Sequence, residues 1–158
     1  MVAALPLERG KGIEGELDTL RKNKTLRGIR RLIQNQPDPD FCIRPQFVEG
    51  LKLLSAHDLV FDICIFYHHL PNAIKMVRQC PEVRFVLDHI GTPESMGFWA
   101  GREAEARGEW AALIGKLAQR PNVTIKLGGL GMDVTGGIGS TSRGAPSQRL
   151  ADKWRPYI

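Results

Sequence analysis

Five short apolar runs alternate with helical segments along this chain, and that alternation constrains the fold more than any other feature. The run at 59–66 is nearly continuous and is broken only by Asp62, which is typical of a strand buried on both faces of a parallel sheet. Successive runs begin about 25 to 40 residues apart, which suits strand–helix units. The pattern predicts an α/β fold with a parallel sheet and right-handed crossovers. We expect strands at 1–5, 26–33, 59–66, 83–89 and 123–127.

Helices are expected between these strands, where apolar residues recur at three- and four-residue spacing. Pro45 and Pro71 each suit the first turn of a helix, and the two prolines within 35–40 exclude a helix there. Residues 94–108 are rich in Gly and in charged residues, which indicates a long loop with a partial helix. We predict helices at 11–21, 45–56, 70–79 and 109–119.

The chain changes character towards its C-terminus. Residues 128–147 hold many Gly and Ser but lack the Gly-Lys-Ser/Thr spacing of a phosphate-binding loop, so we interpret them as a flexible loop. The last segment, 146–158, contains Trp154 and has the pattern of the beginning of a helix. We therefore divide the chain into an α/β unit at 1–132 and a Gly/Ser-rich loop with the start of a helix at 133–158.

The charge of the chain does not point to a nucleic-acid partner. The formal net charge is +5 and the pI is about 9.4, but the Lys and Arg residues are scattered. Their densest cluster, at 21–31, has no interleaved aromatic residues of the kind on which single-strand binders stack bases. We therefore expect no nucleic-acid partner.

The sequence also lacks signs of a membrane or secretory role. No run reaches the ~18 apolar residues of a membrane span, and the N-terminus has no basic leader of a signal peptide. The three cysteines form no CxxC pair, which disfavours a disulfide framework and a structural zinc site. This cysteine usage fits a reducing compartment. We expect a cytoplasmic protein with no membrane partner, in which Cys64 is a small buried apolar side chain.

His89 is the first candidate catalytic residue. It lies where the predicted strand 83–89 ends, before Gly91 and Pro93 force a turn, and barrel enzymes present catalytic groups at such strand tips. A neutral imidazole there can serve as a base or as a metal ligand. The alternative is a histidine that only caps the strand. Asp88 should point to the opposite face, where we expect it to pair with a neighbouring Arg or Lys.

Five segments occur here in the order seen in amidohydrolase-related proteins, and the chain most resembles their sugar-lactone hydrolase branch. The segments are RGIRRLIQ at 27–34, PDPDF at 37–41, FDIC at 61–64, LDHIG at 87–91 and TIKL at 124–127. The resemblance covers about residues 1–132, which it makes an amidohydrolase-like partial barrel. It implies an incomplete (β/α)8 TIM-type barrel, a fold of typically ~250 residues, of which this chain would hold the third to seventh strands.

The chemistry that the resemblance implies is hydrolysis of small cyclic esters, such as sugar lactones, or of related carboxylic substrates, by a water that histidine and carboxylate groups activate. The family's His-x-His pair on the first strand and Asp on the eighth have no counterpart here, and Thr92 stands where the family often has Lys. We therefore expect this chain by itself to be weakly active or inactive. A divalent metal such as zinc assists many amidohydrolases, but the ligand set is incomplete, so we predict no metal ligand.

Several residues are candidates for contact with such a small-molecule substrate. His68 and His69 follow the strand 59–66, so one of them should face the barrel mouth, with structural capping as the alternative. Strand alternation allows one of Arg30 and Arg31 to point inward. We choose Arg31, whose planar fork suits a lactone carbonyl or a carboxylate, against the alternative of a solvated or salt-bridged arginine.

Gln34 and Lys126 complete the candidates. Gln34 closes the same strand as Arg31, and Lys126 shares one face of the strand 123–127 with Thr124. A lysine inside a sheet is costly unless it is paired, so we expect Lys126 to line the barrel interior. The predicted site has one catalytic residue, His89, and five substrate-binding residues: Arg31, Gln34, His68, His69 and Lys126.

Two interpretations from other classes remain. The chain can be a non-catalytic barrel remnant that acts through self-association or a partner, since an open sheet leaves two edges that favour pairing with other chains; a homo-oligomer would cover them. An open sheet that binds a nucleotide would need a Gly-rich turn after its first strand. Only Gly10 and Gly12 lie near that position, so we rank the nucleotide interpretation last.

Overall fold

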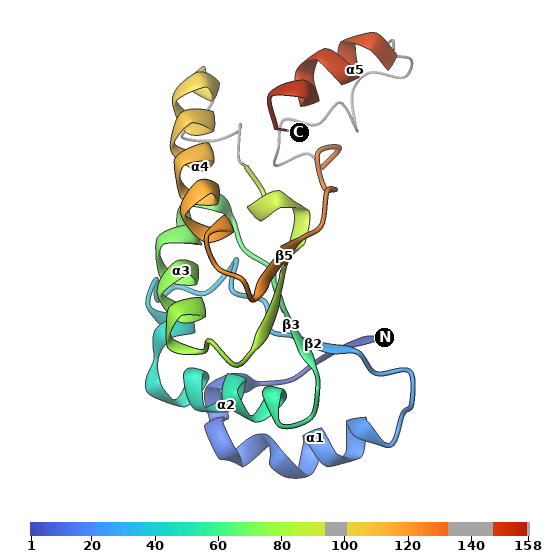
Figure 1. Ribbon diagram of the computed structural model, residues 1–158. Coiled ribbons are helices and arrows are strands. Elements are labelled where there is room, and N and C mark those ends of the chain that lie inside the picture. The colour runs from blue at the N-terminus through green and yellow to red at the C-terminus, as the bar shows by residue number, and fades with distance from the viewer. Residues whose placement is uncertain (94–100, 133–146, 158) are drawn as a thin grey trace.

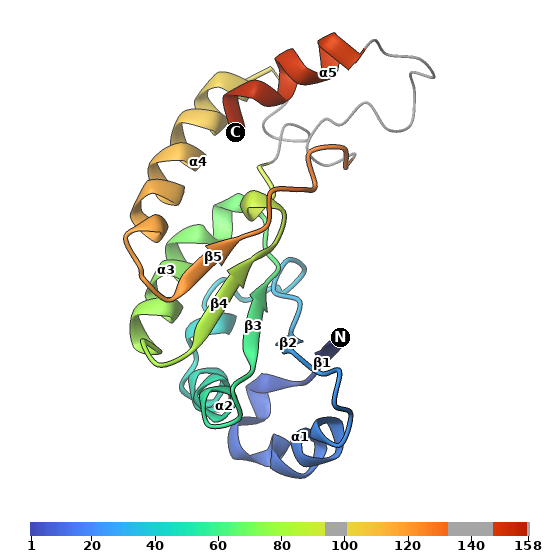
Figure 2. The ribbon, with the colours of Figure 1, turned by 45° about the vertical axis from the view of Figure 1, so that its right-hand side comes forward.

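A single parallel sheet of five strands forms the centre of the molecule, in a computed structural model that describes residues 1–93, 101–132 and 147–157. The strands lie side by side in chain order, β1-β2-β3-β4-β5 (Figure 1; all five are labelled in Figure 2). This order is that of a run of (β/α) barrel units, in which each strand pairs with the next. The predicted α/β fold with parallel strands is therefore confirmed. The strands are β1 Val2–Ala4, β2 Gly28–Arg30, β3 Val60–Ile63, β4 Arg84–Leu87 and β5 Val123–Ile125.

The helices α2, α3 and α4 stand along one side of the sheet (Figure 2). The α-helices are α1 Glu14–Arg21, α2 Pro45–Ser55, α3 Leu70–Gln79, α4 Glu103–Ala118 and α5 Ser147–Trp154. Short 3₁₀ turns connect them: η1 Leu7–Ile13, η2 Phe41–Ile43, η3 Tyr67–His69, η4 Asp88–Gly91 and η7 Arg155–Tyr157. In the described parts of the chain, no helix is long and apolar enough to cross a membrane.

Most predicted elements are present, with different boundaries at two helices. The helix expected at 11–21 begins only at Glu14, because residues 11–13 belong to the 3₁₀ segment η1, in which Gly10 has a positive φ of 55°. Helix α4 begins at Glu103, six residues before the predicted start at 109, since Gly108 lies inside the helix without ending it. The loop predicted within 128–147 falls mainly outside the described residues.

A row of four phenylalanines forms the centre of the core between the sheet and its helices. The rings stack edge to face along the row, with centroids 5.2, 6.0 and 6.2 Å apart, an arrangement that aromatic pairs prefer. The row runs from η2 through α2 to β3 and β4, and every member is buried. Its members are Phe41, Phe47, Phe61 and Phe85.

The two faces of the sheet differ in chemistry. Ile29, Phe61 and Phe85 point to the helices and are fully or almost fully buried, whereas the alternate residues Arg30 and Asp62 lie side by side on the other face. That second face is the interior of the partial barrel. It carries charged and polar groups towards the C-terminal ends of the strands, which is where barrel enzymes place their active sites.

Candidate functional site

Four charged residues meet at the C-terminal edge of the sheet. They are Arg30 at the end of β2, Asp62 in β3, Asp88 directly after β4 and Lys126 directly after β5. The Lys126 Nζ donates a hydrogen bond to Asp62 Oδ2 and another to Asp88 Oδ1, each of 2.6 Å. We call these four residues the charged cluster.

Arg30 joins the charged cluster through longer ion pairs. Its Nη2 lies 3.6 Å from Asp62 Oδ2 and its Nε lies 3.5 Å from Asp88 Oδ2. The strand register explains the first contact, because Arg30 and Asp62 are direct neighbours across β2 and β3. Asp88 Oδ2 is buried and accepts no hydrogen bond, so Arg30 balances its charge without satisfying it as an acceptor.

The acidic and the basic side chains of the cluster differ in burial. The side chains of Asp62 and Asp88 are 1% and 2% exposed, whereas those of Arg30 and Lys126 are 38% and 45% exposed. Buried carboxylates are tolerated only when they are paired, and here the pairing comes from cations above them. The group of four is formally neutral, but its open side presents the two positive ends to the barrel interior.

Lys126 remains a cation because of its two carboxylate partners. Burial by itself would lower its pKa, but the hydrogen bonds to Asp62 and Asp88 outweigh burial, so the pKa of Lys126 is raised above its usual value. The ammonium is therefore protonated at neutral pH. It can stabilise negative charge that develops on a carbonyl oxygen placed beside it.

His89 lies in a left-handed turn directly after Asp88. The φ angles of His89, Ile90, Gly91 and Thr92 are 55°, 51°, 74° and 44°, a conformation that costs roughly 1–2 kcal/mol for each residue other than glycine. Strand β4 therefore ends at Leu87, two residues before the predicted end. The strict alternation assumed for Asp88 and His89 does not apply, because the second of them is no longer extended.

Hydrogen bonds from three other elements hold this turn. Ile90 N donates to the Lys126 carbonyl at 3.1 Å, Trp110 Nε1 donates to the Ile90 carbonyl at 2.8 Å, and Tyr67 N donates to the Thr92 carbonyl at 3.2 Å. The side chain of Ile90 is also buried in the core. Strained backbone persists only where its surroundings determine it, and such sites are often functional. The partners here are the residue directly after β5 and residues of α4 and η3.

Gly129 packs against the Cβ of His89. We expect the Gly129→Ala variant to displace the His89 side chain. A Cβ at position 129 would lie 2.5 Å from His89 Cβ and 2.9 Å from its Cγ, and the φ of Gly129 is +78°. Overlap with an anchored turn and a positive φ should together lower the free energy of unfolding by roughly 2 kcal/mol. A urea melt and the His89 ring signals in an NMR spectrum measure both effects.

Two other glycines, the adjacent Gly128 and the distant Gly101, provide controls for that variant. Gly128→Ala meets nothing within 4 Å and needs no positive φ, so it should leave the melt and the His89 signals unchanged. Gly101→Ala meets nothing within 4 Å but has a φ of +80°, so it measures the backbone cost alone. If Gly129→Ala lowers the free energy of unfolding no more than Gly101→Ala does and leaves the His89 signals unshifted, then Gly129 does not pack against His89 as described.

The expectation that Arg31 rather than Arg30 faces the barrel interior is wrong. Arg31 follows the end of β2 and turns to Glu8, which accepts hydrogen bonds from its Nε and Nη2 at 2.9 and 2.7 Å. Its guanidinium also lies 5.2 Å from the ring centroid of Phe41. The hydrogen bond with Arg31 lowers the pKa of Glu8. The register of β2 against β3 places Arg30, not Arg31, beside Asp62.

The other predicted residues lie near the same strand ends. The rings of His68 and His69 are 4.1 Å apart in η3, and His69 Nδ1 lies 3.2 Å from the Phe66 carbonyl oxygen. Burial, together with the nearby His68, lowers the pKa of His69. Gln34 Oε1 accepts a hydrogen bond of 3.5 Å from the thiol of Cys64. Lys126 is part of the charged cluster, whereas substrate contact by these side chains stays a prediction.

The thiols do not provide a nucleophile for this site. All three cysteines are buried and free, as expected for Cys64. Burial raises the pKa of Cys42 and of Cys80 to about 11 and also raises the pKa of Cys64. Because the thiolate is the reactive form of cysteine, these side chains are unreactive at neutral pH.

The charged cluster does not fit a metal ion. Among the described residues, no group of three or more His, Cys, Asp and Glu side chains could hold one. The two carboxylates that converge at the strand ends already share the ammonium of Lys126, which occupies the position that a cation would need.

Sequence reasoning missed three members of the charged cluster as site residues: Arg30, Asp62 and Asp88. Asp62 carried a usable signal, since it is the one charged residue in an otherwise apolar strand. Asp88 was expected to pair with a basic residue, and that pairing is confirmed by Lys126. The choice between the adjacent arginines needed the strand register.

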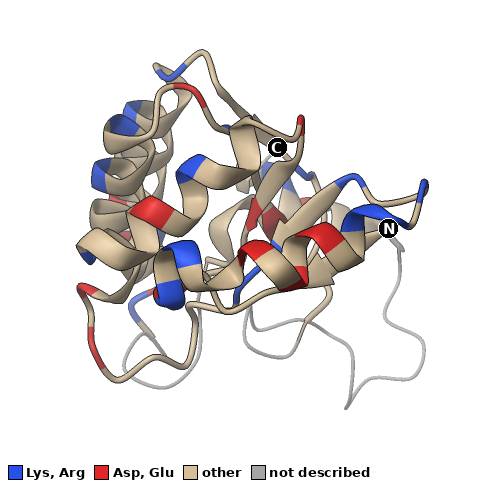
Figure 3. Cartoon of the chain, turned by 90° about the horizontal axis from the view of Figure 1, so that it is seen from below, with Lys and Arg blue, Asp and Glu red and all other residues tan. Residues whose placement is uncertain are grey.

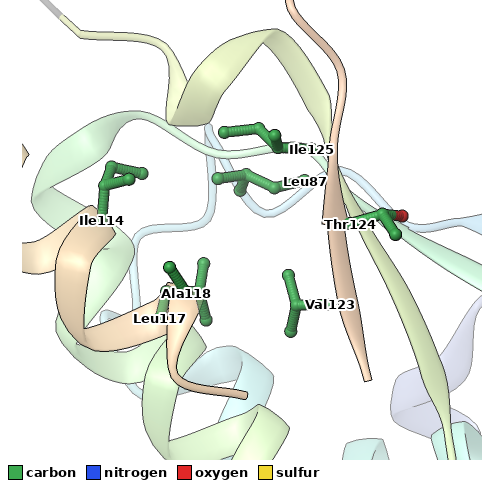
Figure 4. Close-up of a pocket in the computed structure, with 7 residues that line it drawn as sticks. All are labelled: Leu87, Ile114, Leu117, Ala118, Val123, Thr124 and Ile125. Carbon is green, nitrogen blue, oxygen red and sulfur yellow. The ribbon is translucent and has the colours of Figure 1, made fainter. Parts of the chain in front are cut away.

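An apolar recess of about 190 Å³ lies between α4 and β5, on the helix side of the sheet (Figure 4). Leu87 and Val123 come from the strands, and Ile114 and Leu117 from the helix. It contains none of the charged cluster, so it is not the candidate site.

In Figure 3, Lys and Arg are interspersed with Asp and Glu along the helices, and no purely basic face is visible in that view.

Residues 1–157 match the family model described as amidohydrolase. Two L-fucono-1,5-lactonases are similar: one from Burkholderia ambifaria is 33% identical over 115 residues, and one from Burkholderia multivorans is 34% identical over 106 residues. The matches span 73% and 66% of this chain but only 37% and 35% of those proteins. The chain thus spans little more than a third of the length of these curated relatives.

Solved structures share the fold. A crystal structure of an amidohydrolase from Burkholderia multivorans with bound zinc has a TM-score of 0.71 and 25% identity, and covers 90% of this chain and 49% of that one. The same protein with bound HEPES has a TM-score of 0.74 and 27% identity, with 91% and 49% covered. The chain belongs to the amidohydrolase family. Within that family it falls in the lactonase-like branch.

Proposed function

We propose that this chain carries part of the active site of a hydrolase that opens small cyclic esters, with sugar lactones as the substrate class. The observation that carries the proposal is the charged cluster, which meets at the C-terminal ends of four neighbouring strands beside His89. The L-fucono-1,5-lactonase relatives support this substrate class. They also favour a hydrolase over a non-catalytic role.

The residues of this chain can divide the work of ester hydrolysis. His89 is the candidate base that takes a proton from the attacking water, while the Lys126 ammonium and the Arg30 guanidinium stabilise the charge that develops on the carbonyl oxygen. The water oxygen bonds to the carbonyl carbon, the ring C–O bond breaks, and the released ring oxygen takes a proton. The product is a hydroxy acid. Asp62 and Asp88 hold the two cations in position.

We expect the isolated 158-residue chain to hydrolyse lactones weakly. The cations of the cluster are 38% and 45% exposed, and a site that is open to water loses much of the electrostatic advantage of a closed one. Binding of the lactone should be easier to detect than its turnover.

Two measurements on the purified chain test the proposal. Saturation-transfer NMR with L-fucono-1,5-lactone detects binding, and titration of released acid at constant pH detects hydrolysis. We expect binding with slow hydrolysis, and loss of hydrolysis in the His89→Ala variant. The control is His57→Ala, which lies between α2 and β3 at the opposite end of the strands.

The outcomes separate the two claims. The absence of both binding and hydrolysis with sugar lactones would contradict the proposed function. Fast turnover that His89→Ala abolishes would support the function and contradict only the expectation of weak activity. Hydrolysis that survives in His89→Ala would remove His89 from the role of base.

A further inference from the structure

We propose that Arg30, with Lys126 beside it, forms a carboxylate-binding subsite that holds the acid group of a sugar acid, the ring-opened product. The identity of the ligand rests on the proposed function. The subsite itself rests on the contacts of Arg30, which are ion pairs at 3.5 and 3.6 Å and not hydrogen bonds such as those of Arg31.

Arg30 is anchored by charge while its hydrogen-bond donors remain uncommitted. Its two ion pairs, at 3.5 and 3.6 Å, are at or beyond the limit of a hydrogen bond. Within the described residues, its guanidinium donates no hydrogen bond to the protein. An arginine offers five N–H donors in a planar fork. The Nε and Nη2 of Arg30 lie nearest the two aspartates, so the N–H groups on the outer edge of its guanidinium are the ones available to a ligand.

The neighbouring Arg31, by contrast, uses its guanidinium donors in hydrogen bonds within the protein. Its Nε and Nη2 donate to the Glu8 carboxylate at 2.9 and 2.7 Å, and Phe41 covers its guanidinium. The two adjacent arginines therefore have different roles. Arg31 links β2 to Glu8 through hydrogen bonds, whereas Arg30 keeps hydrogen-bond donors for a ligand on the interior face of the sheet. On Arg30 the Nε and Nη2 lie nearest Asp88 and Asp62, so a ligand carboxylate would bind in a bidentate way through the outer N–H groups of Nη1 and Nη2.

Lys126 adds a second cation to the subsite. Two of its three N–H groups are donated to Asp62 and Asp88, which leaves one for a ligand. The two carboxylates lie buried below, and the two cationic ends lie at the surface of the cluster. A ligand that approaches from the barrel interior therefore meets positive charge first.

This geometry favours the acid over the lactone. A carboxylate presents two equivalent charged oxygens, which match the spacing of an arginine fork, and hydrogen bonds between charged groups are about twice as strong as neutral ones. A lactone presents one neutral carbonyl oxygen and a ring oxygen of poor basicity. We therefore expect the sugar acid to bind at least about tenfold more tightly than the lactone, and to inhibit hydrolysis as it accumulates.

The test is an NMR titration of the ¹⁵N-labelled chain with L-fuconate at pH 7 and fixed ionic strength. The Nε–H signal of Arg30, assigned by its loss in Arg30→Lys, should shift and saturate in the wild-type chain. Arg30→Lys keeps the charge but loses the fork, so it should weaken L-fuconate binding at least about tenfold. The matched control is Arg84→Lys at the start of β4, which pairs with Asp58 and should bind L-fuconate as the wild type does.

Each outcome decides between the claims. Unchanged L-fuconate binding in Arg30→Lys, or an equal effect of added chloride on the Arg30 signal, would overturn the subsite. Binding or hydrolysis of the lactone without any L-fuconate binding would overturn the subsite and leave the proposed function standing. Arg30-dependent binding of L-fuconate, with no lactone bound or hydrolysed, would support the subsite and contradict the proposed function.

Discussion

Replacing Lys126 by methionine should destabilise the chain by roughly 2–3 kcal/mol. Methionine keeps the length of the side chain but removes the ammonium that donates to Asp62 and Asp88. Two carboxylates that are 1% and 2% exposed would then have Arg30 as their remaining partner, at 3.5 and 3.6 Å. Breaking a buried pair from one side leaves an uncompensated charge. Arg30 and solvent at the exposed lysine reduce the cost below that of a fully buried pair.

Urea melts of three variants measure this effect and identify its cause. Lys116→Met, on the exposed side of α4, should change the free energy of unfolding by less than about 0.5 kcal/mol. The triple variant Asp62→Asn, Asp88→Asn, Lys126→Met removes all three charges and should recover part of the loss. If Lys126→Met is as stable as Lys116→Met, or if the triple variant is no more stable than Lys126→Met, the charge-pairing account is wrong.

The contribution of Lys126 also predicts a pH dependence. A cation whose pKa is raised in the folded state stabilises that state at every pH below its unfolded pKa, and the contribution is lost as the pH rises through the folded pKa. The unfolded value is 10.5. The difference between the wild type and Lys126→Met should therefore stay constant from pH 6 to 9 and shrink above about pH 10.5.

Truncating Phe61 to alanine should have the largest effect on the fold. Phe61 is fully buried in the middle of the row of four phenylalanines, with Phe47 on one side and Phe85 on the other. Removing such a ring costs about 3–5 kcal/mol, because the transfer term and the cavity add. Small domains have a total stability of about 5–15 kcal/mol, so we expect Phe61→Ala to be partly unfolded at 25 °C.

Circular dichroism and a urea melt measure that loss. Phe61→Leu keeps most of the buried volume and should cost only about 1 kcal/mol. Phe66→Ala is a second comparison, since that ring lies outside the row and is only partly buried. A cost below 1 kcal/mol for Phe61→Ala, or a cost equal to that of Phe66→Ala, would show that the row is not the centre of the core.

The sequence predicted the elements well where local signals were strong. Helix α3 has the predicted bounds, 70–79, and α2 differs by one residue, because a proline in the first turn and an apolar stripe mark both. Every predicted strand is present but shorter than its apolar run. Some flanking residues, such as Ile33 and Ile65, are buried outside the strands, whereas Leu127 is exposed. Hydrophobicity alone therefore does not distinguish a turn from an extended segment.

The candidate site was predicted only in part. Lys126 was expected inside the barrel and lies there, and Asp88 was expected to have a basic partner and has one. The inward arginine was chosen wrongly, because strand alternation says that only one of two neighbours points inward but not which. The left-handed turn at His89 was not foreseen, since it is held by hydrogen bonds that Tyr67 and Trp110 donate and by one that the Lys126 carbonyl accepts, and these residues are distant in the sequence.

The sequence by itself determined a parallel α/β fold, because strand burial and helix periodicity are local patterns that each segment carries alone. The tertiary structure decided which side chains form the site. Lys126 and Asp62 are 64 residues apart in the chain, and Lys126 and Asp88 are 38 apart. Their contact exists because parallel strands bring their C-terminal ends to one edge. The choice of partners there follows from strand register, which depends on the whole sheet.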